Sequence, residues 1–220
     1  MKKINKDNFI KYLFFLLFVK PFILWALGIN ARGMENLPQE GPAIIVANHN
    51  SHIDTLIIMS LFSCTTITQI HPVAAEDYFC NTKLKKFLFK TLIGIIPIKR
   101  KLEKLPKEEI FKDINNALNN NEMIIIFPEG TRGEDNKLKN FKTGISHIAE
   151  MNPNVPIIPL YINGPDKILP KVDAILVPFI SDIYISNQIF WDNSPKKEFT
   201  EKIKHIIEEL YEKHRRKEEL

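Results

Sequence analysis

A histidine and an aspartate stand five residues apart directly after a short apolar run. The run is Ala43–Ala47, and His49 and Asp54 follow it. A carboxylate that holds one imidazole nitrogen fixes the tautomer and leaves the other nitrogen as a base, which is the arrangement needed to take a proton from a hydroxyl group. The hydroxyl to be activated would belong to a substrate. This pair is therefore the candidate catalytic centre.

The spacing limits how the two side chains can meet. Within one helix, five residues would separate them by about 140°. We expect instead that Ser51 caps a helix that begins at His52, with Asp54 as the third helical residue and His49 on the preceding turn. His49 can then fold back toward the carboxylate. The alternative is that Asp54 only caps the helix and His49 makes local hydrogen bonds.

A second polar group follows the apolar run Met123–Phe127. Glu129 can bind a ligand hydroxyl or pair with an arginine, and Arg132 offers a planar fork for a phosphate group. Thr131 and the backbone of Gly130 can add hydrogen bonds. The alternative is a plain turn that carries a surface arginine.

Two weaker signals also suit an anion. Arg100 follows the apolar stretch Gly94–Ile98, and Lys142 precedes Gly144 at an expected helix start. Helix N-termini and arginine forks both bind phosphate groups. The candidate binding residues are therefore Arg100, Glu129, Gly130, Thr131, Arg132 and Lys142.

Alternating apolar runs and amphipathic stretches indicate an α/β domain with a largely parallel sheet flanked by helices. In such sheets, sites form where strands end and helices begin, so the groups above should share one edge. Pro156 and Pro159 suggest that their strand lies partly at an edge. Expected strands are 43–47, 71–75, 93–98, 123–127, 155–162, 174–179 and 183–189, and expected helices are 52–62, 83–92, 107–119, 144–151 and 197–215.

Composition and charge exclude several classes of protein. Apolar residues make up 45% and charged residues 25% of the 220 residues, which excludes disorder and a polytopic membrane protein. Two cysteines cannot form a disulfide framework or a four-ligand zinc site. The net charge is +4, but residues 83–105 hold eight basic residues and one acidic residue, hence +7. This stretch favours a phosphorylated ligand, an acidic protein or an anionic lipid surface rather than a nucleic acid.

The N-terminal thirty residues favour contact with a membrane. The apolar runs Tyr12–Val19 and Pro21–Ile29 are divided by Lys20, and a proline and a lysine at the midpoint disfavour a transmembrane span. We expect two short helices in the membrane interface over residues 1–30, followed by one domain over residues 31–220. A tilted span, a cleaved signal peptide and a buried helix remain alternatives.

The order and spacing of these groups resemble the glycerolipid acyltransferase family, best known from the 1-acylglycerol-3-phosphate acyltransferases. The resemblance covers roughly residues 31–180. Four blocks carry it: Asn48-His49-x-Ser51-x-x-Asp54, Gly94-x-x-Pro-Ile-Lys99-Arg100, Phe127-Pro128-Glu129-Gly130-Thr131-Arg132 with Phe141-Lys142-x-Gly144, and Val155-Pro-Ile-Ile-Pro159.

The resemblance implies a general base at His49, oriented by Asp54, which activates the free hydroxyl of a lysolipid toward an acyl thioester. It also associates Arg100, Glu129 and Arg132 with the acceptor headgroup. The implied partners are membrane lipids, a lysophospholipid acceptor, and acyl-coenzyme A or acyl carrier protein as co-substrate, without a metal, another cofactor or a nucleic acid. The implied place is the cytoplasmic face of the cell (inner) membrane.

The leading reaction is acylation of 1-acyl-sn-glycerol 3-phosphate to phosphatidic acid. Residues 73–78 depart from the family pattern, which leaves the acceptor open. Acylation of another lysophospholipid or of a lyso-aminolipid is the first alternative. A catalytically silent lipid-binding protein on the same fold, or a metal-dependent hydrolase, are the others.

Overall fold

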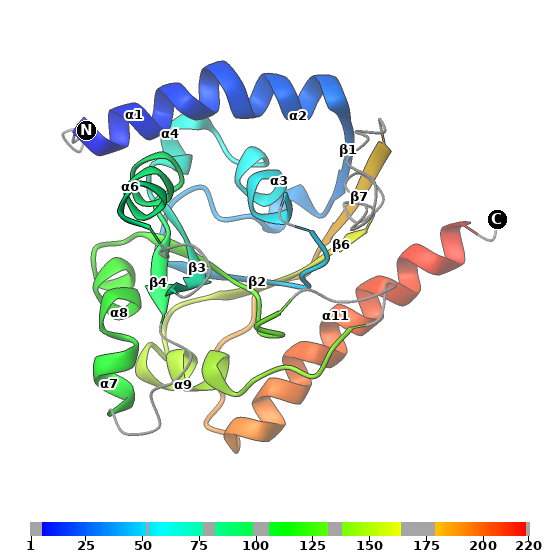
Figure 1. The fold of residues 1–220 in the computed structure, drawn as a ribbon. Coiled ribbons are helices and arrows are strands. Elements are labelled where there is room, and N and C mark those ends of the chain that lie inside the picture. The colour runs from blue at the N-terminus through cyan, green and yellow to red at the C-terminus, as the bar shows by residue number, and fades with distance from the viewer. Residues whose placement is uncertain are drawn as a thin grey trace.

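Five strands of the central sheet run in one direction, and two strands at one end run the opposite way (Figure 1). The computed structural model describes residues 6–51, 53–76, 82–98, 106–131, 138–163 and 179–218. The sheet has the order β1-β7-β6-β2-β5-β3-β4. Its strands are β1 (Leu27–Arg32), β2 (Ala43–Ala47), β3 (Ile70–Ala75), β4 (Ile96–Ile98), β5 (Met123–Ile126), β6 (Ile157–Asn163) and β7 (Phe179–Ile185).

All pairings are parallel except that between β6 and β7. The prediction of a mostly parallel α/β sheet flanked by helices is therefore confirmed. The carboxyl ends of β2, β3, β4, β5 and β6 share one edge of the sheet, which we call the catalytic edge. Strand β1 was not predicted from the sequence, because residues 27–29 were counted with the N-terminal apolar run Pro21–Ile29.

Helices cover both faces of the sheet and give the fold three layers (Figure 1). One face packs against the N-terminal helices, α3 and α4, and the other packs against α8, α9 and α11. The bounds are α1 (Lys6–Phe14), the π-helical η1 (Phe15–Val19), α2 (Lys20–Ala26), the 3-10 turn η2 (Met34–Asn36), α3 (Asp54–Ser60), α4 (Cys64–Ile67), α6 (Lys83–Leu92), α7 (Lys107–Ile110), α8 (Lys112–Asn119), α9 (Gly144–Met151) and α11 (Lys196–Glu218).

Alternating residues of the strands divide the core into two clusters. Ile45 and Ile125 face the N-terminal helices, whereas Ile44 and Ile124 face α8 and α9, and all four side chains are fully buried. Strands buried on both faces read as continuous apolar runs, which is why these runs were recognised in the sequence.

The prediction that β6 lies at an edge is wrong. β6 pairs with β2 on one side and β7 on the other, and its seven residues are all buried. The antiparallel ladder with β7 begins at Leu160, one residue after Pro159, and the carbonyl of Pro159 still accepts the N–H of Ser186. The missing N–H of Pro159 therefore falls just outside the ladder, where it breaks no pairing.

The N-terminal segment forms one continuous helical run rather than two separate helices. The run passes through Pro21 because the preceding turn is π-helical, with the N–H of Lys20 bound to the carbonyl of Phe15. A wider turn gives room where a proline ring would otherwise meet the carbonyl four residues earlier. The amine of Lys20 donates to the carbonyl of Phe62, 2.6 Å away.

The same run packs on the sheet through Phe15, Val19 and Ile23, which are buried against α3. Within the described ranges, no helix combines the length and the apolar character needed to cross a bilayer. The predicted boundary at residue 30 falls inside β1, and the division into a membrane segment and a domain stays a prediction. The expected strand 174–179 lies outside the described residues except for its last residue.

Candidate active site

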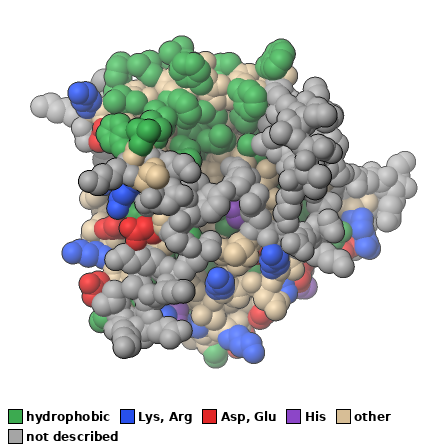
Figure 2. Space-filling view, in the orientation of Figure 1, with side chains coloured by type: hydrophobic (Ala, Val, Ile, Leu, Met, Phe, Trp, Pro, Cys, Tyr) green, Lys and Arg blue, Asp and Glu red, His purple; other side chains and the backbone are tan. Residues whose placement is uncertain are grey.

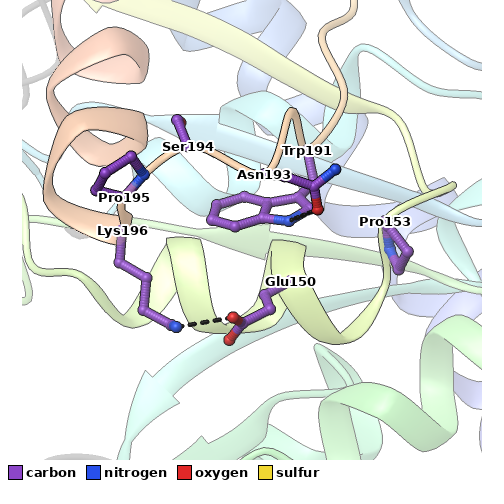
Figure 3. Close-up of a pocket in the computed structure, with 7 residues that line it drawn as sticks. All are labelled: Glu150, Pro153, Trp191, Asn193, Ser194, Pro195 and Lys196. Carbon is purple, nitrogen blue, oxygen red and sulfur yellow. Dashed lines mark hydrogen bonds and ion pairs between the residues drawn. The ribbon is translucent and has the colours of Figure 1, made fainter.

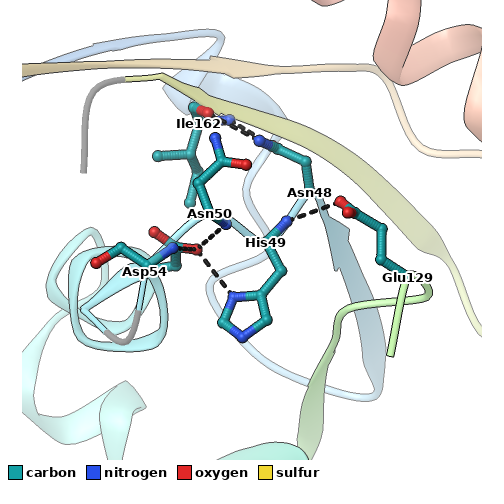
Figure 4. Close-up of polar contacts among 7 residues, drawn as sticks. Asn48, His49, Asn50, Asp54, Glu129 and Ile162 are labelled. Carbon is teal, nitrogen blue, oxygen red and sulfur yellow. Dashed lines mark hydrogen bonds and ion pairs between the residues drawn. The ribbon is translucent and has the colours of Figure 1, made fainter. Parts of the chain in front are cut away.

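Strand β2 delivers the polar sequence to the catalytic edge through an amide clamp at Asn48. The side-chain nitrogen of Asn48 donates to the carbonyl of Ile162 over 2.9 Å, and the N–H of Ile162 donates back to its side-chain oxygen over 2.8 Å (Figure 4). The buried side chain thus mimics a peptide group and extends the β2–β6 pairing by one step. The clamp fixes where the chain leaves the sheet and therefore where His49 starts.

His49 and Asp54 meet directly. Nδ1 of His49 lies 2.9 Å from Oδ2 of Asp54, as Figure 4 shows. The same oxygen accepts the backbone N–H of Asn50 at 2.7 Å and of Ser51 at 2.8 Å. A carboxylate can only accept, so Nδ1 carries the proton and Nε2 keeps its lone pair. The carboxylate is fully buried, whereas the imidazole retains 20% exposure through which a substrate can approach.

The local turn differs in detail from the prediction. Helix α3 begins at Asp54 rather than at His52, and its N-cap, Ile53, makes no side-chain cap hydrogen bond. Asp54 instead reaches back to the N–H groups of Asn50 and Ser51, which is the acidic half of a capping box. His52 lies outside the described residues. The carboxylate therefore both caps this turn and orients His49.

The ring of Phe127 supports the imidazole from the neighbouring strand end. The two ring centroids are 4.3 Å apart with an interplanar angle of 22°. Phe127 follows β5, the strand next to β2 in the sheet. This contact and the hydrogen bond to Asp54 hold the imidazole on two sides, which limits its rotation.

Glu129 joins the two polar groups. Its Oε1 accepts the N–H of His49 over 2.9 Å, and the side chain is only 3% exposed (Figure 4). Burial raises the pKa of the Glu129 carboxyl group, although N–H groups of His49 and Lys139 oppose the shift. The sequence placed Glu129 at the acceptor headgroup. The structure shows it holding the backbone of His49, and its role toward a ligand stays a prediction.

The loop after Glu129 brings a lysine to the same edge. Gly130 has φ +70°, and a Cβ there would lie 2.6 Å from Nζ of Lys142. The N–H of Lys142 donates to the carbonyl of Pro128 over 2.9 Å, while its side chain is exposed. Glycine therefore lets the amine of Lys142 cross the loop, beside the exposed Thr131. This cationic group stands at the edge that also holds His49.

Two predicted binding residues, Arg100 and Arg132, lie outside the described residues. Strand β4 ends at Ile98 on the catalytic edge. Within the described ranges, no group of three or more His, Cys, Asp or Glu residues is placed to hold a metal ion. No role was assigned to Asn48 or Phe127 from the sequence, and for Asn48 the available signal was an asparagine directly after an apolar run.

A pocket elsewhere has no relation to this centre. It is a depression of about 360 Å³, and Lys196 and Glu150 in its lining form a 2.8 Å ion pair. In Figure 3 this pair lies below Trp191. The depression lies between α9 and the segment that follows β7. Because β7 is antiparallel to β6, this segment leaves the sheet at the edge opposite the catalytic one. The pocket is therefore separate from His49.

Comparison with known proteins supports the reading of these motifs. The model of a family described as Acyltransferase matches residues 28–163. The chain is 30% identical over 146 residues to the chloroplastic 1-acyl-sn-glycerol-3-phosphate acyltransferase LPAT1 of Arabidopsis thaliana. The aligned segment covers 64% of this chain and 38% of the relative. It is 28% identical over 149 residues to the mouse 1-acyl-sn-glycerol-3-phosphate acyltransferase alpha, covering 68% of this chain and 50% of that protein.

A solved structure shares the fold. The 1-acyl-sn-glycerophosphate (LPA) acyltransferase PlsC of Thermotoga maritima superimposes with a TM-score of 0.71 over 96% of this chain and 84% of that chain, at 21% identity. At this identity the likeness concerns the fold. The matched segment spans half of the curated relatives' length or less, from 38% to 50% in the two described above.

Proposed function

Because the chain belongs to the acyltransferase family, we propose that it transfers a fatty acyl group from a thioester to the free hydroxyl of 1-acyl-sn-glycerol 3-phosphate, which gives phosphatidic acid. The donor is acyl-coenzyme A or acyl carrier protein. The relatives named above carry the acceptor in their names, which supports this choice for the present chain.

One observation carries the proposal. The hydrogen bond between His49 and Asp54 leaves Nε2 of a partly exposed imidazole as the base at the catalytic edge. Nε2 takes the proton of the acceptor hydroxyl as its oxygen attacks the thioester carbonyl carbon. The tetrahedral intermediate then expels the thiolate, which recovers the proton from the imidazolium to leave as a thiol. A positioned base of this kind supplies about 10²–10⁴-fold in rate.

The positive charge at the edge supports an anionic acceptor. The amine of Lys142 lies over Gly130 at the catalytic edge, and an exposed amine there suits a phosphate group. Arg100 and Arg132 complete the proposed headgroup site, on the sequence argument alone. The first alternative is another lysophospholipid, which differs in what the headgroup carries beyond the phosphate, or a lyso-aminolipid.

The surface of the N-terminal run supports action at a membrane interface. Its outward side exposes large apolar side chains over the top of the view in Figure 2. They are Phe9, Leu16, Leu17, Phe18, Phe22 and Trp25, with Trp25 at 85% exposure. Apolar patches of this extent mark contact sites, and aromatic side chains suit the interface of a bilayer.

Helix α3, which starts at Asp54, packs directly beneath this run through Ile57 and Ile58. The proposed site thus lies one helical layer from the proposed membrane contact. A lysolipid can reach it without its acyl chain being moved far into water, which would cost about 0.8 kcal/mol per CH₂. The side of the membrane stays the prediction made from the sequence.

The test is product identification. The purified full chain is incubated with acyl-coenzyme A or acyl carrier protein and a panel of lysolipids, and products are identified by mass. Phosphatidic acid as the main product supports the proposal. Acylation of a different lysolipid supports the first alternative. Thioester that is not consumed with any acceptor would contradict an enzyme and favour a silent lipid-binding protein.

A further inference from the structure

Helix α6 turns its apolar side outward. Leu84, Phe87 and Leu88 share one side of the helix and are 67%, 63% and 41% exposed. Among the side chains of the helix that the structure describes, Thr91 alone is buried, at 9% exposure, and it ends the same side one turn after Phe87. An amphipathic helix of a soluble domain normally buries its apolar side against the core. Here the three large apolar side chains of the stripe stay exposed, so the stripe is free to contact a partner.

The stripe adjoins the exposed side of the N-terminal run. Helix α6 packs against α1, which exposes Phe9. Figure 2 shows hydrophobic side chains gathered over the part of the molecule where α1, α2 and α6 lie in Figure 1. The apolar surface is therefore built from two separate segments of the chain.

The charged residues of α6 itself are all basic. Residues 83–92 contain four lysines and no acidic residue. The side chains of Lys86 and Lys90 are exposed. Nζ of Lys86 lies 3.5 Å from Oε1 of Glu76 in a solvent-exposed ion pair. Ion pairs exposed in this way are weak. The helix thus offers apolar side chains bordered by cations.

We infer that α6 is a second membrane-contacting element, which places Leu84, Phe87 and Leu88 in the interfacial region of an anionic phospholipid bilayer with its lysines at the level of the phosphate groups. The inference rests on the proposed function, since it assumes that the chain works on lipids at an interface. Basic amphipathic helices with large apolar side chains bind bilayers in this way. Contacts through both α6 and the N-terminal run fix how the domain sits on the surface.

Other occupants fit the surface less well. A symmetric dimer through α6 would set lysine-rich helices against each other, because both copies contribute the same surface. An acidic carrier protein would use the lysines but would gain little from three exposed Leu and Phe side chains. A bilayer with anionic headgroups uses both features.

The first experiment measures sedimentation of the full chain with phosphatidylcholine vesicles, with and without phosphatidylglycerol. The variant L84S/F87S/L88S should lose roughly tenfold or more in partitioning onto the anionic vesicles. The matched control M34S/F190S removes exposed apolar side chains of other regions and should bind as the wild type does. Wild-type binding by the α6 variant overturns the inference.

A second readout does not depend on affinity. In a Trp25→Phe, Trp191→Phe background, Phe87→Trp should be quenched by lipids brominated on their acyl chains, whereas Phe190→Trp should not. Absence of quenching at position 87 on vesicles that bind the protein contradicts the inference. Loss of binding to acidic carrier protein in Lys86→Glu/Lys90→Glu, with vesicle binding intact, would assign the helix to the carrier instead.

The acyltransferase assay separates the two proposals. With lysolipid dispersed in detergent, L84S/F87S/L88S should keep wild-type turnover, because these residues lie outside the catalytic centre. If this variant keeps its turnover and also binds vesicles as the wild type does, only the proposed role of α6 is refuted. Absence of turnover in the wild type would refute the proposed function, whatever the vesicles show.

Discussion

Oδ2 of Asp54 lies 2.9 Å from Nδ1 of His49 and accepts two backbone N–H groups of the intervening turn. One oxygen therefore shapes the turn that presents His49 and also fixes the tautomer of its ring. The carboxylate is fully buried, which limits its motion away from these partners. Structure and chemistry are coupled at this atom, which makes Asp54 the most informative position after His49.

The substitution Asp54→Asn should separate these two roles. An amide oxygen in the same place can still accept the N–H groups of Asn50 and Ser51 and the Nδ1 proton, but a neutral amide no longer stabilises the imidazolium that forms when Nε2 takes a proton. We expect kcat to fall about 10²–10⁴-fold. Thiol release measures kcat, and a thermal melt checks the fold. A folded variant with wild-type kcat would show that the carboxylate only caps the helix.

Glu129 should act through the backbone of His49. Glu129→Ala leaves the N–H of His49 without its acceptor, at a cost of about 1–3 kcal/mol in the free energy of unfolding. Glu129→Gln keeps an oxygen acceptor and should retain most of the stability and activity. Urea unfolding and thiol release compare the two variants. Equal losses of activity in Glu129→Ala and Glu129→Gln would instead indicate that the negative charge of Glu129 binds substrate.

Comparison of the wild type with Glu129→Gln also tests the pKa shift of the Glu129 carboxyl group. Burial raises the pKa of its carboxyl group above the usual 4.5, so the folded state holds this proton more firmly than the unfolded state does. Stability contributed by the protonated form is therefore lost as the pH rises above 4.5. Glu129→Gln should remove this part of the decline. A decline of the same size in the variant would contradict the assignment.

Lys142 should bind the anionic part of the acceptor. Lys142→Ala should raise KM for lysophosphatidic acid about tenfold, the loss of roughly one charge-assisted hydrogen bond. Because the Lys142 side chain is exposed, the substitution should leave the free energy of unfolding unchanged. A monoacylglycerol acceptor without phosphate serves as the control. Gly130→Ala should show the same KM effect, because its Cβ displaces the amine, plus a strain cost of about 1–2 kcal/mol from the positive φ. Unchanged KM in both variants would contradict the proposed role.

A buried amine far from the site predicts a pH effect on stability. Lys11 is 2% exposed, and burial lowers its pKa from 10.5 to about 7, although Glu122 opposes the shift. Between these values the unfolded state binds a proton that the folded state has released, so stability should rise with pH from 7 toward 10.5. Lys11→Met should flatten this rise in thermal melts. An equal rise in the variant would show that Lys11 stays charged.

Much of the fold followed from the sequence because the central strands are buried on both faces. The apolar runs at β2 and β5 were recognised for this reason. Local patterns could not show β1, whose pairing partner β7 lies about 150 residues away in the sequence. The position of Pro159 next to, rather than inside, the ladder with β7 likewise depends on long-range register.

The geometry at the centre of the candidate site was predictable from the sequence, whereas the contacts of Glu129 were not. The meeting of His49 and Asp54 followed from local spacing and is seen in the structure. The bond from His49 to Glu129 spans eighty positions, so the sequence did not show that Glu129 supports the backbone. The outward side of α6 was equally hidden, because amphipathicity shows which residues share a face but not which way that face points.

The account depends most on His49 as the base, and acceptor-dependent thiol release tests it most directly. His49→Gln should lower the turnover of acyl thioester with lysophosphatidic acid about 10²–10⁴-fold, with the melting temperature and vesicle binding of the wild type retained. A folded His49→Gln protein that releases thiol at a rate within a few-fold of the wild type would contradict the central claim.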